Sequence, residues 1–423
     1  MHLKEKPFQI YLHICILSKT FYKSMKYYSV VTFSLFLISP LFSLPLILYG
    51  VYHRYKSSIL FFALFVGLMG YLTPPVSDLY RHTIDYYSYE FLSWKAFRGT
   101  LERDFVTQTL SYVFCKNSIP YDFIRFLYLT IQFYVSLWVF YKVSNANVYK
   151  RGKRDLFLRF LIWILFSNFI VSALGVRFPL ASSFYVLGCY YLLHKRNMKK
   201  AIFFFGISMC VHFSMCYFII LLFVIYKIPF KKRSAVLCMI MVSLIISEVV
   251  IKNLESYFIS QDLYGGAYLG NGVWGTGFKE QASLKGVIYS YIMQACMIPY
   301  YIYFYKSYDS QNRWCRWMSG ALILIAMSFS LETVSSRVRP LFGALSMAYL
   351  LAMESEGKIM SDKLRRAFVF FACIAFMSNL YTNRETIIHS RYLRIAEPVP
   401  LLLSDHYTKY WVFTNVANDG SIK

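Results

Sequence analysis

Residues 201–226 read AIFFFGISMCVHFSMCYFIILLFVIY, an apolar run without a charged side chain. At 1.5 Å per residue, one helix of this length would cross about 30 Å of hydrocarbon. Lys199 and Lys200 precede the run, however, and Lys227 follows it. Because cytoplasmic loops collect lysine and arginine, basic residues at both ends place both ends on the same side of a membrane. We therefore expect two short helices that go out and return, with a break at 212–214; the alternative is one tilted helix that violates the charge rule.

The whole chain has the composition of a membrane protein. Of its 423 residues, 57% are hydrophobic and only 16% are charged, against about 25% charged in a soluble protein. Its apolar runs are roughly 17–25 residues long, which is the length of a transmembrane helix. We expect an all-α, polytopic integral membrane protein with about twelve transmembrane or half-membrane helices. The expected helices are 29–50, 57–72, 121–142, 156–174, 178–194, 201–212, 213–226, 234–251, 285–305, 317–335, 340–353 and 367–381.

The net charge of +24 is concentrated in short loops between the apolar runs. This is the positive-inside pattern, which sets the orientation of a membrane protein during insertion. No basic patch is interleaved with stacking aromatic residues on a soluble segment, so nucleic acid is not an expected partner. The six loops expected in the cytoplasm contain Arg54/Lys56, Lys142–Arg154, Lys195–Lys200, Lys227–Arg233, Lys306–Arg316 and Lys358–Arg366.

This orientation divides the chain into three parts and leaves one question open. The N-terminal segment carries five lysines, and either residues 8–22 form an extra membrane segment or Met25 is the true start. Within the first outer loop, residues 105–114 are predicted to form an interfacial amphipathic helix, too short to cross. The predicted parts are a basic N-terminal segment, 1–28; a polytopic membrane domain, 29–381, with outer loops 73–120 and 252–284; and an extracytoplasmic tail, 382–423.

Arginines on the outer side run against the positive-inside pattern. Four of them, Arg81, Arg177, Arg337 and Arg339, fall in predicted outer turns, each within a few residues of a helix end. The planar guanidinium group matches pairs of phosphate oxygens. If these four arginine side chains converge on the outer side, they would bind an anionic lipid head such as a diphosphate. The alternative is that each arginine pairs with an acid or reaches up to lipid phosphates.

Three titratable groups are expected on the same side. Asp78 and Asp85 follow a Pro-Pro pair, and their spacing of seven places both on one face of a continuing helix. Either acid is a candidate general base or a ligand for a sugar hydroxyl, and a salt bridge with Arg81 is the competing interpretation. His212, at the predicted break, is the other candidate base, because a neutral imidazole accepts a proton near pH 7. Its competing interpretation is a structural hydrogen bond.

The outer loop 252–284 combines aromatic residues, among them Tyr264 and Trp274, with glycines and polar groups. Aromatic rings stack on the faces of sugars, although anchoring at a membrane interface gives the same composition. The GxGxxG at 270–275 follows no expected strand and does not indicate a dinucleotide site. The sequence has no Walker loop, HExxH, GxSxG or DxD pair, and most of its cysteines lie inside apolar runs. No cofactor, metal or disulfide framework is expected.

Taken in order, several short motifs resemble the EpsG-like branch of the Wzy-type polysaccharide polymerases. Residues 77–81 (SDLYR) are similar to a Ser/Thr-Asp motif that follows the second helix of that family. Residues 175–181 (GVRFPLA) resemble its arginine-led helix start, and residues 211–214 (VHFS) resemble its His-x-Ser bend. Residues 336–342 (SRVRPLF) are similar to its later outer arginine element. The resemblance covers about 29–381.

The resemblance implies a membrane glycosyltransferase, a polysaccharide polymerase of GT-C-like architecture that works without a metal ion. It would join oligosaccharide repeats carried on undecaprenyl diphosphate, at the outer face of the bacterial cytoplasmic membrane, with the lipid diphosphate as leaving group. The product would be O-antigen, capsule or exopolysaccharide, and the implied partners include membrane lipid, a chain-length regulator and a flippase. The implied site consists of Arg177, Arg337 and Arg339 on the diphosphate, Arg81 in reserve, and His212 or Asp78 as the base for the sugar hydroxyl.

Other functions share some of these features. A lipid-linked oligosaccharide flippase or other transporter would also need arginines, but it predicts charges deeper in the helices and two related halves, and the sequence shows neither. An O-antigen-type ligase would use the same outer-face chemistry with a different acceptor. A membrane-bound acyltransferase would need its histidine near cytoplasmic acyl-CoA, which the expected topology denies.

Overall fold

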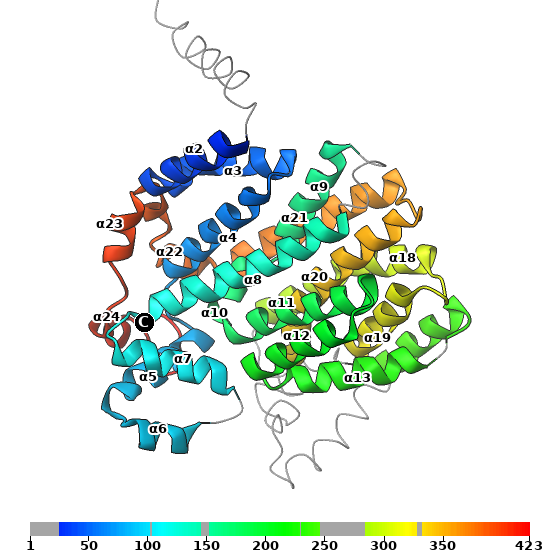
Figure 1. Cartoon of the computed structure of the whole chain (residues 1–423). Helices are drawn as coiled ribbons and strands as arrows, with labels where there is room; N and C mark the ends of the chain where they lie inside the picture. Colours follow the sequence, from blue (N-terminus) through cyan, green and yellow to red (C-terminus); the bar gives the residue numbers. More distant parts are fainter. Residues whose placement is uncertain (1–24, 102–103, 145–151, 229, 246–283, 328–331) are drawn as a thin grey trace, which may run out of the picture.

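The structure, a computed structural model, describes residues 25–101, 104–144, 152–228, 230–245, 284–327 and 332–423, and for 332–342 it describes the backbone alone. These residues form helices joined by turns (Figure 1). The β pairing among them is an isolated bridge between Val416 and Ile422. The all-α fold class predicted from the sequence is confirmed.

The described helices range from short pieces of five to seven residues to helices of 24 residues. A further helical segment, 233–245, follows α13. In chain order the elements are α2 (Met25–Ile38), α3 (Pro40–His53), α4 (Lys56–Tyr71), α5 (Asp78–Ser88), η1 (Tyr89–Phe91), α6 (Trp94–Thr100), α7 (Phe105–Lys116), α8 (Tyr121–Ser144), α9 (Lys153–Phe166), α10 (Phe169–Leu174), α11 (Arg177–Cys189), η3 (Tyr190–His194), α12 (Met198–Val211), α13 (Met215–Lys227), α17 (Leu284–Ala295), α18 (Ile298–Ser307), α19 (Arg313–Met327), α20 (Glu332–Ser355), α21 (Asp362–Thr382), α22 (Arg384–Ile388), η4 (Tyr392–Ala396), α23 (Val399–Ser404) and α24 (Lys409–Asn415).

Helix α8 lies at the centre of the bundle, where it packs along α4 and against α11 and α20. Two glycines of α4 allow the close approach of α4 and α8. A Cβ on Gly67 would lie 2.9 Å from the carbonyl oxygen of Phe126, and a Cβ on Gly70 would collide with the side chain of Leu129. Small residues at such contacts let helix backbones approach closely, which is how helices pack in membranes.

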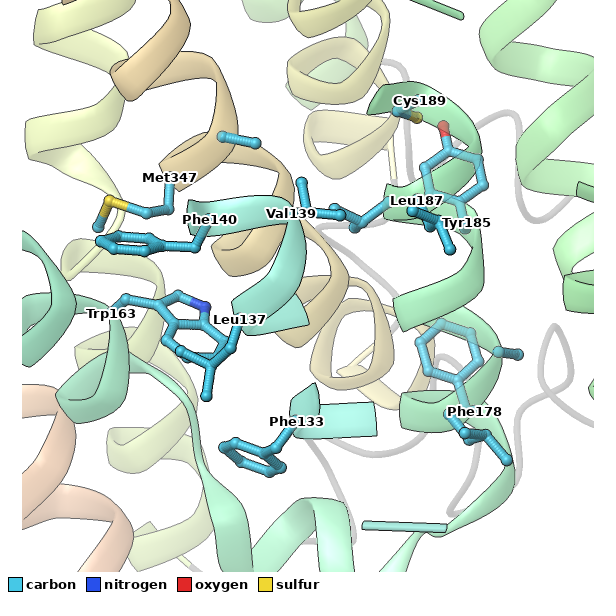
Figure 2. Packing of buried hydrophobic residues seen from close by; sticks show 14 of the residues in the cluster. Phe133, Leu137, Val139, Phe140, Trp163, Phe178, Tyr185, Leu187, Cys189 and Met347 are labelled. Atoms are coloured by element: carbon cyan, nitrogen blue, oxygen red, sulfur yellow. The ribbon is translucent and has the colours of Figure 1, made fainter. Parts of the chain in front are cut away.

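Aromatic side chains fill the contact between α8 and α9. Phe133 and Phe140 of α8 meet Trp163 of α9 at ring-centroid distances of 6.0 and 6.4 Å. Figure 2 shows Phe140 and Trp163 against each other with Met347 of α20 beside them, and Phe178 at the start of α11. This buried packing fixes α8, α9 and α11 relative to one another, and the polar residues discussed below lie at the ends of these helices.

The predicted break in residues 201–226 is present. Helix α12 ends at Val211, the backbone of His212 is extended (φ −150°, ψ 111°), and α13 begins at Met215. The two halves have different neighbours, because α12 packs mainly against α11 and α13 mainly against α19. The alternative interpretation, one tilted helix, is wrong.

Three predicted helices are pairs of shorter helices, and one of them, 285–305, divides into α17 and α18 at residues 296–297. The predicted helix 29–50 divides at Ser39, whose side chain caps α3, and Pro40 follows as the first helical residue. The predicted helix 156–174 divides before Asn168, whose side chain accepts the amide of Val171 (3.1 Å) and caps α10. Capping side chains and prolines begin new helices inside runs whose hydrophobicity is continuous.

The predicted outer turn at 335–340 is wrong. Helix α20 runs without interruption from Glu332 to Ser355, and Pro340 lies inside it. The prediction ended one helix at 335 and began the next at Pro340. Inside a helix, proline removes one main-chain hydrogen bond and clashes with the preceding turn. Helices of membrane proteins tolerate proline when neighbouring groups satisfy the freed backbone group. Arg337 and Arg339 are therefore helical residues, not turn residues.

Two of the described helices, α8 and α21, are long and apolar enough to cross a membrane by length and composition. Shorter apolar helices accompany them at 27–38, 56–71, 215–224 and 233–245. The count of about twelve spans, the GT-C-like architecture and the three-part division of the chain stay predictions. Of the predicted N-terminal segment, residues 1–24 lie outside the described residues.

The predicted outer loop 73–120 folds into short helices at one end of the bundle. Helices α5 and α7 pack against each other there, with η1 between them, and α24 lies beside them (Figure 1). The predicted amphipathic helix at 105–114 is α7. We refer to this part of the molecule as the α5–α7 end.

Candidate active site

Asp104 stands immediately before α7, and its side chain is only 6% exposed. An acid in this position usually caps its own helix by accepting an amide of the first turn. The Asp104 side chain makes no such hydrogen bond, and the hydroxyl of Thr107 donates instead to the Asp104 carbonyl (2.9 Å). The carboxylate points away from its own helix and reaches the elements that pack against α7.

Both carboxylate oxygens of Asp104 are bound by other helix ends. Arg177, the first residue of α11, donates from Nη1 to Oδ2 at 2.9 Å, and His212 Nδ1 lies 2.8 Å from the same oxygen. The amide of Phe213 donates to Oδ1 at 2.8 Å. One carboxylate thus joins α7, the N-terminus of α11 and the break between α12 and α13. We call Asp104, Arg177 and His212 the Asp104 centre.

Opposing effects act on the charge of Asp104. Burial raises the pKa of its carboxyl group, because the charged form loses hydration. The hydrogen bond and charge of His212, the positive charge of Arg177 and the Phe213 amide all lower it. Together they outweigh burial, and the pKa of Asp104 lies below its ordinary value. Asp104 is therefore an anion at neutral pH.

His212 is held in one orientation by this contact. With Nδ1 facing a carboxylate, the neutral imidazole donates from Nδ1 and carries its lone pair on Nε2. The ring packs edge-on against Phe178, with centroids 5.6 Å apart and planes at 83°. The extended backbone at the break turns the residue out of α12. A fixed Nδ1 and a lone pair on Nε2 are the arrangement that a general base requires.

Arg177 combines a buried contact with an outward-facing part. Its side chain is 27% exposed although Nη1 is bound to Asp104. Arg177 also begins α11, where first-turn amides without helical partners add partial positive charge. Its charge acts on the hydroxyls of Tyr121 and Tyr128 on α8. The guanidinium is therefore a fixed cation beside the oriented histidine.

Helix α5 carries a second group of polar residues. Arg81 pairs with Asp78, and His82 lies between the two acids, with Nε2 3.7 Å from Asp78 Oδ2 and Nδ1 4.0 Å from Asp85 Oδ2. The predicted placement of both acids on one helix face is confirmed. Arg81 remains 56% exposed.

The α5 group borders the Asp104 centre. Helix α5 packs against α7, which follows Asp104, and against α10, which precedes Arg177. The charges of Asp78 and Arg177 both act on the hydroxyl of Tyr121 at the start of α8. Three of the sequence motifs thus meet at the α5–α7 end: the aspartate motif on α5, the arginine that begins α11 and the histidine at the break.

Comparison with known families decides what these motifs mean. The chain matches the EpsG family over residues 58–388. It belongs to the EpsG family. The predicted resemblance is confirmed, and the match runs from α4 to α22. Membership of the EpsG family indicates a role in polysaccharide biosynthesis and association with a membrane. No curated protein and no solved structure matches the chain.

The structure does not test the other predicted site residues of this EpsG-family chain. Arg337 and Arg339 lie on α20 in the part described as backbone alone. Tyr264 and Trp274 lie outside the described residues. The roles predicted for these four residues stay predictions. Among the described residues, no group of three His, Cys, Asp or Glu side chains is placed to hold a metal ion.

Sequence reasoning missed Asp104, the residue that joins the centre. An acid directly before an amphipathic helix has the pattern of an ordinary helix cap in solvent, and the pattern gives no sign of burial. The sequence did offer one signal. Arg177 and the buried His212 each required an acidic partner, and none had been named for them. Asp104 is the acid at the start of the interfacial helix that covers them.

Sequence reasoning also missed a buried ion pair in the first turn of α8. Arg125 is fully buried, pairs with Asp122 and donates to the carbonyl oxygen of Thr73. Charged side chains in an apolar membrane helix are costly and deserve a functional or structural explanation. Asp122 and Arg125 stood inside the predicted helix 121–142, so this signal was present in the sequence.

Proposed function

We propose that this EpsG-family protein is a polysaccharide polymerase, a membrane glycosyltransferase that joins oligosaccharide repeats carried on a lipid diphosphate. The observation that carries the proposal is the Asp104 centre, where one buried carboxylate orients a histidine and an arginine from adjoining helix ends. Such a polymerase needs a base for a sugar hydroxyl and a cation for a departing diphosphate. His212 and Arg177 supply these groups side by side. The proposed carrier is undecaprenyl diphosphate, at the outer face of the cytoplasmic membrane.

The proposed reaction exchanges one C–O bond for another. The hydroxyl oxygen of the acceptor sugar attacks the anomeric carbon of the donor chain, while the bond from that carbon to the diphosphate oxygen breaks. The electron pair leaves with the lipid diphosphate, and the hydroxyl proton moves to Nε2 of His212. Asp104 stabilises the imidazolium that forms, because its carboxylate already lies 2.8 Å from Nδ1.

Arg177 is the proposed partner of the leaving diphosphate. Negative charge grows on the diphosphate as the bond breaks, and a cation that is already in place stabilises that charge without reorganising. Its contact with Asp104 fixes the guanidinium, while its exposed part faces outward. The N-terminus of α11 adds partial positive charge at the same point.

The structure supports His212 over Asp78 as the base. The carboxylate of Asp78 is already paired with Arg81, whereas the neutral imidazole of His212 carries a lone pair on Nε2. We therefore propose that Asp78 binds a sugar hydroxyl, and that Arg81, which is mostly exposed, is an additional contact for phosphate.

The test of the proposed function is the surface polysaccharide of cells that lack the gene. Deletion should leave single capped repeats on a gel, and the wild-type gene should restore long chains. His212→Ala and Arg177→Ala should fail to restore them at unchanged membrane abundance. His194→Ala is the matched control, since His194 is a partly buried histidine at the end of η3, and it should restore long chains.

Each other outcome has its own meaning. Loss of all surface sugar on deletion would indicate a flippase or a ligase and would contradict the polymerase. Normal chain length with His212→Ala or Arg177→Ala would remove that residue from the mechanism. A ligase would further differ because long chains would accumulate on the lipid carrier instead of on the final acceptor.

A further inference from the structure

Residues 389–423 follow the part of the chain that matches the EpsG family, and they fold back onto the segment that leads into α5. The amide of Arg391 donates to the carbonyl of Leu72 (3.1 Å), and the amide of Ser77 donates to the carbonyl of Gly420 (2.7 Å). The hydroxyl of Tyr407 also donates to the Leu72 carbonyl, at 3.0 Å. The end of the chain therefore lies at the α5–α7 end (Figure 1).

Tyr407 is fixed by the buried ion pair of α8. Its amide donates to Asp122 Oδ2 at 3.0 Å. Its ring lies beside two guanidinium groups, 5.7 Å from Arg125 and 4.2 Å from Arg391. Because Arg125 also donates to the Thr73 carbonyl, one cluster joins α8, the segment before α5 and the C-terminal segment. Charge-assisted hydrogen bonds and cation–π contacts of this kind are strong when they are buried.

Ser77 has a backbone conformation that a serine rarely adopts. Its φ is 55° and its ψ is −131°, in the region that favours glycine, and it stands directly before Asp78, the first residue of α5. Such a conformation is costly and persists only where surrounding contacts impose it. The hydrogen bond from the Ser77 amide to the Gly420 carbonyl is one such contact.

Gly420 is shaped to make that contact. Its φ is 84°, and a Cβ there would lie 2.7 Å from the carbonyl oxygen of Ser77 and 3.0 Å from its Cα and nitrogen. A short turn presents the residue, since its own amide donates to Ala417 (2.9 Å) and the Ala417 amide donates to Ser421 (2.8 Å). No other residue type fits this position without moving the two backbones apart.

We infer that the segment 389–423 is a positioning element of the active site, in which Gly420 and Tyr407 hold residues 72–77 and so fix where α5 and Asp78 stand. The inference rests on the proposed function for its catalytic consequence. Helix α24 extends the contact, because Lys409 lies 3.5 Å from Glu90 and over the ring of Tyr87 on α5. The segment acts through Asp78 and takes no part in bond exchange.

The test compares Gly420→Ala with Gly357→Ala in the full-length protein. Both glycines have a positive φ, 84° and 92°, but a Cβ on Gly357 meets nothing within 4 Å. The two variants therefore share the backbone cost and differ in the collision with Ser77. Hydrogen exchange of the purified protein in lipid nanodiscs reports on residues 72–88, and chain length in the deletion strain reports on activity. The double variant Ser77→Gly/Gly420→Ala gives residue 77 a type that adopts positive φ unaided.

Gly420→Ala should speed exchange in 72–88 and lower polymer formation on the order of 10- to 100-fold, the effect of a displacement near 1 Å. Gly357→Ala should do neither, and the double variant should regain polymer. Unchanged exchange or unchanged polymer in Gly420→Ala, equal losses in Gly357→Ala, or no recovery in the double variant would overturn the inference. If the wild-type protein makes no polymer, the proposed function fails, while faster exchange in Gly420→Ala still shows that the segment holds α5.

Discussion

Arg177 and His212 bind the same oxygen atom of Asp104, at 2.9 and 2.8 Å, although Arg177 begins α11 and His212 lies in the break between α12 and α13. The short helix α7 is therefore part of the candidate site, because it positions Asp104. If Asp104 moves, the arginine and the histidine lose their common partner at once. The effects of changing these three residues should be strongly non-additive, as they are in any group that acts as a unit.

Asp104→Asn should abolish long-chain polymer while the protein still folds. The amide side chain keeps the size of the carboxylate, and its oxygen can still accept the Phe213 amide. The substitution removes the negative charge that fixes His212 and stabilises the imidazolium. The same Asp→Asn change in a serine protease triad lowers kcat about 10⁴-fold. We expect a loss on the order of 10²- to 10⁴-fold, measured as chain length and amount on a gel at equal membrane abundance.

Asp309→Asn is the matched control for that variant. Asp309 also accepts a main-chain amide, that of Gln311 at 2.9 Å, but it lies in the turn between α18 and α19. It should restore long chains like the wild type. If Asp104→Asn restored them equally well, Asp104 would have no function beyond packing.

The pKa of Asp104 predicts a pH dependence of stability. Because the folded pKa lies below the ordinary value, ionised Asp104 stabilises the folded protein above pH about 4, the ordinary carboxyl value. That stabilisation is lost as the pH falls through the folded pKa. The difference in melting temperature between wild type and Asp104→Asn should therefore shrink as the pH falls below about 4. A difference that failed to shrink below pH 4 would contradict a lowered pKa of the Asp104 carboxyl group.

The sequence predicted the features that depend on nearby residues. Basic residues on both flanks placed the break at His212, and the same charge rule made Arg177 conspicuous as an outer arginine. Asp78 and Asp85 were placed on one helix face from their spacing alone. Each of these inferences uses helix geometry or charge within one or two helices, and the structure bears out the break and the shared face.

The features that the sequence did not predict depend on distant contacts. Asp104 reaches Arg177 and His212 only because α7 docks on α12, which itself packs against α11. The contact between Ser77 and Gly420 joins residues that are far apart in the sequence. It is made by main-chain atoms, so no pattern of side chains indicates it. Helix α20 continues through Pro340. A local rule about proline does not contain the neighbouring groups that can satisfy the freed carbonyl in a membrane protein.

The proposed orientation places the α5–α7 end outside the cell, and two glycines provide a matched test. Gly99 in α6 and Gly152 before α9 are both exposed, and a Cβ at either one meets nothing within 4 Å. In a protein whose native cysteines are replaced by serine or alanine, Gly99→Cys should react with a membrane-impermeant maleimide in intact cells. Gly152→Cys should react only after the cells are opened. Reaction of both cysteines in intact cells, or of Gly152→Cys alone, would contradict the orientation.

The buried ion pair between α9 and α20 predicts how stability responds to charge. Arg159 donates from Nε and Nη2 to the two carboxylate oxygens of Glu354, at 2.8 and 2.7 Å, and both side chains are buried. Glu354→Gln leaves Arg159 short of negative charge and should destabilise the protein by about 3 kcal/mol, since breaking a buried pair costs more than the pair contributes. Removing both charges in Arg159→Met/Glu354→Gln should recover much of that loss, as measured by thermal unfolding in nanodiscs. A double variant less stable than Glu354→Gln would show that Arg159 stabilises the fold through Asp155, which also accepts a hydrogen bond from it at 2.8 Å.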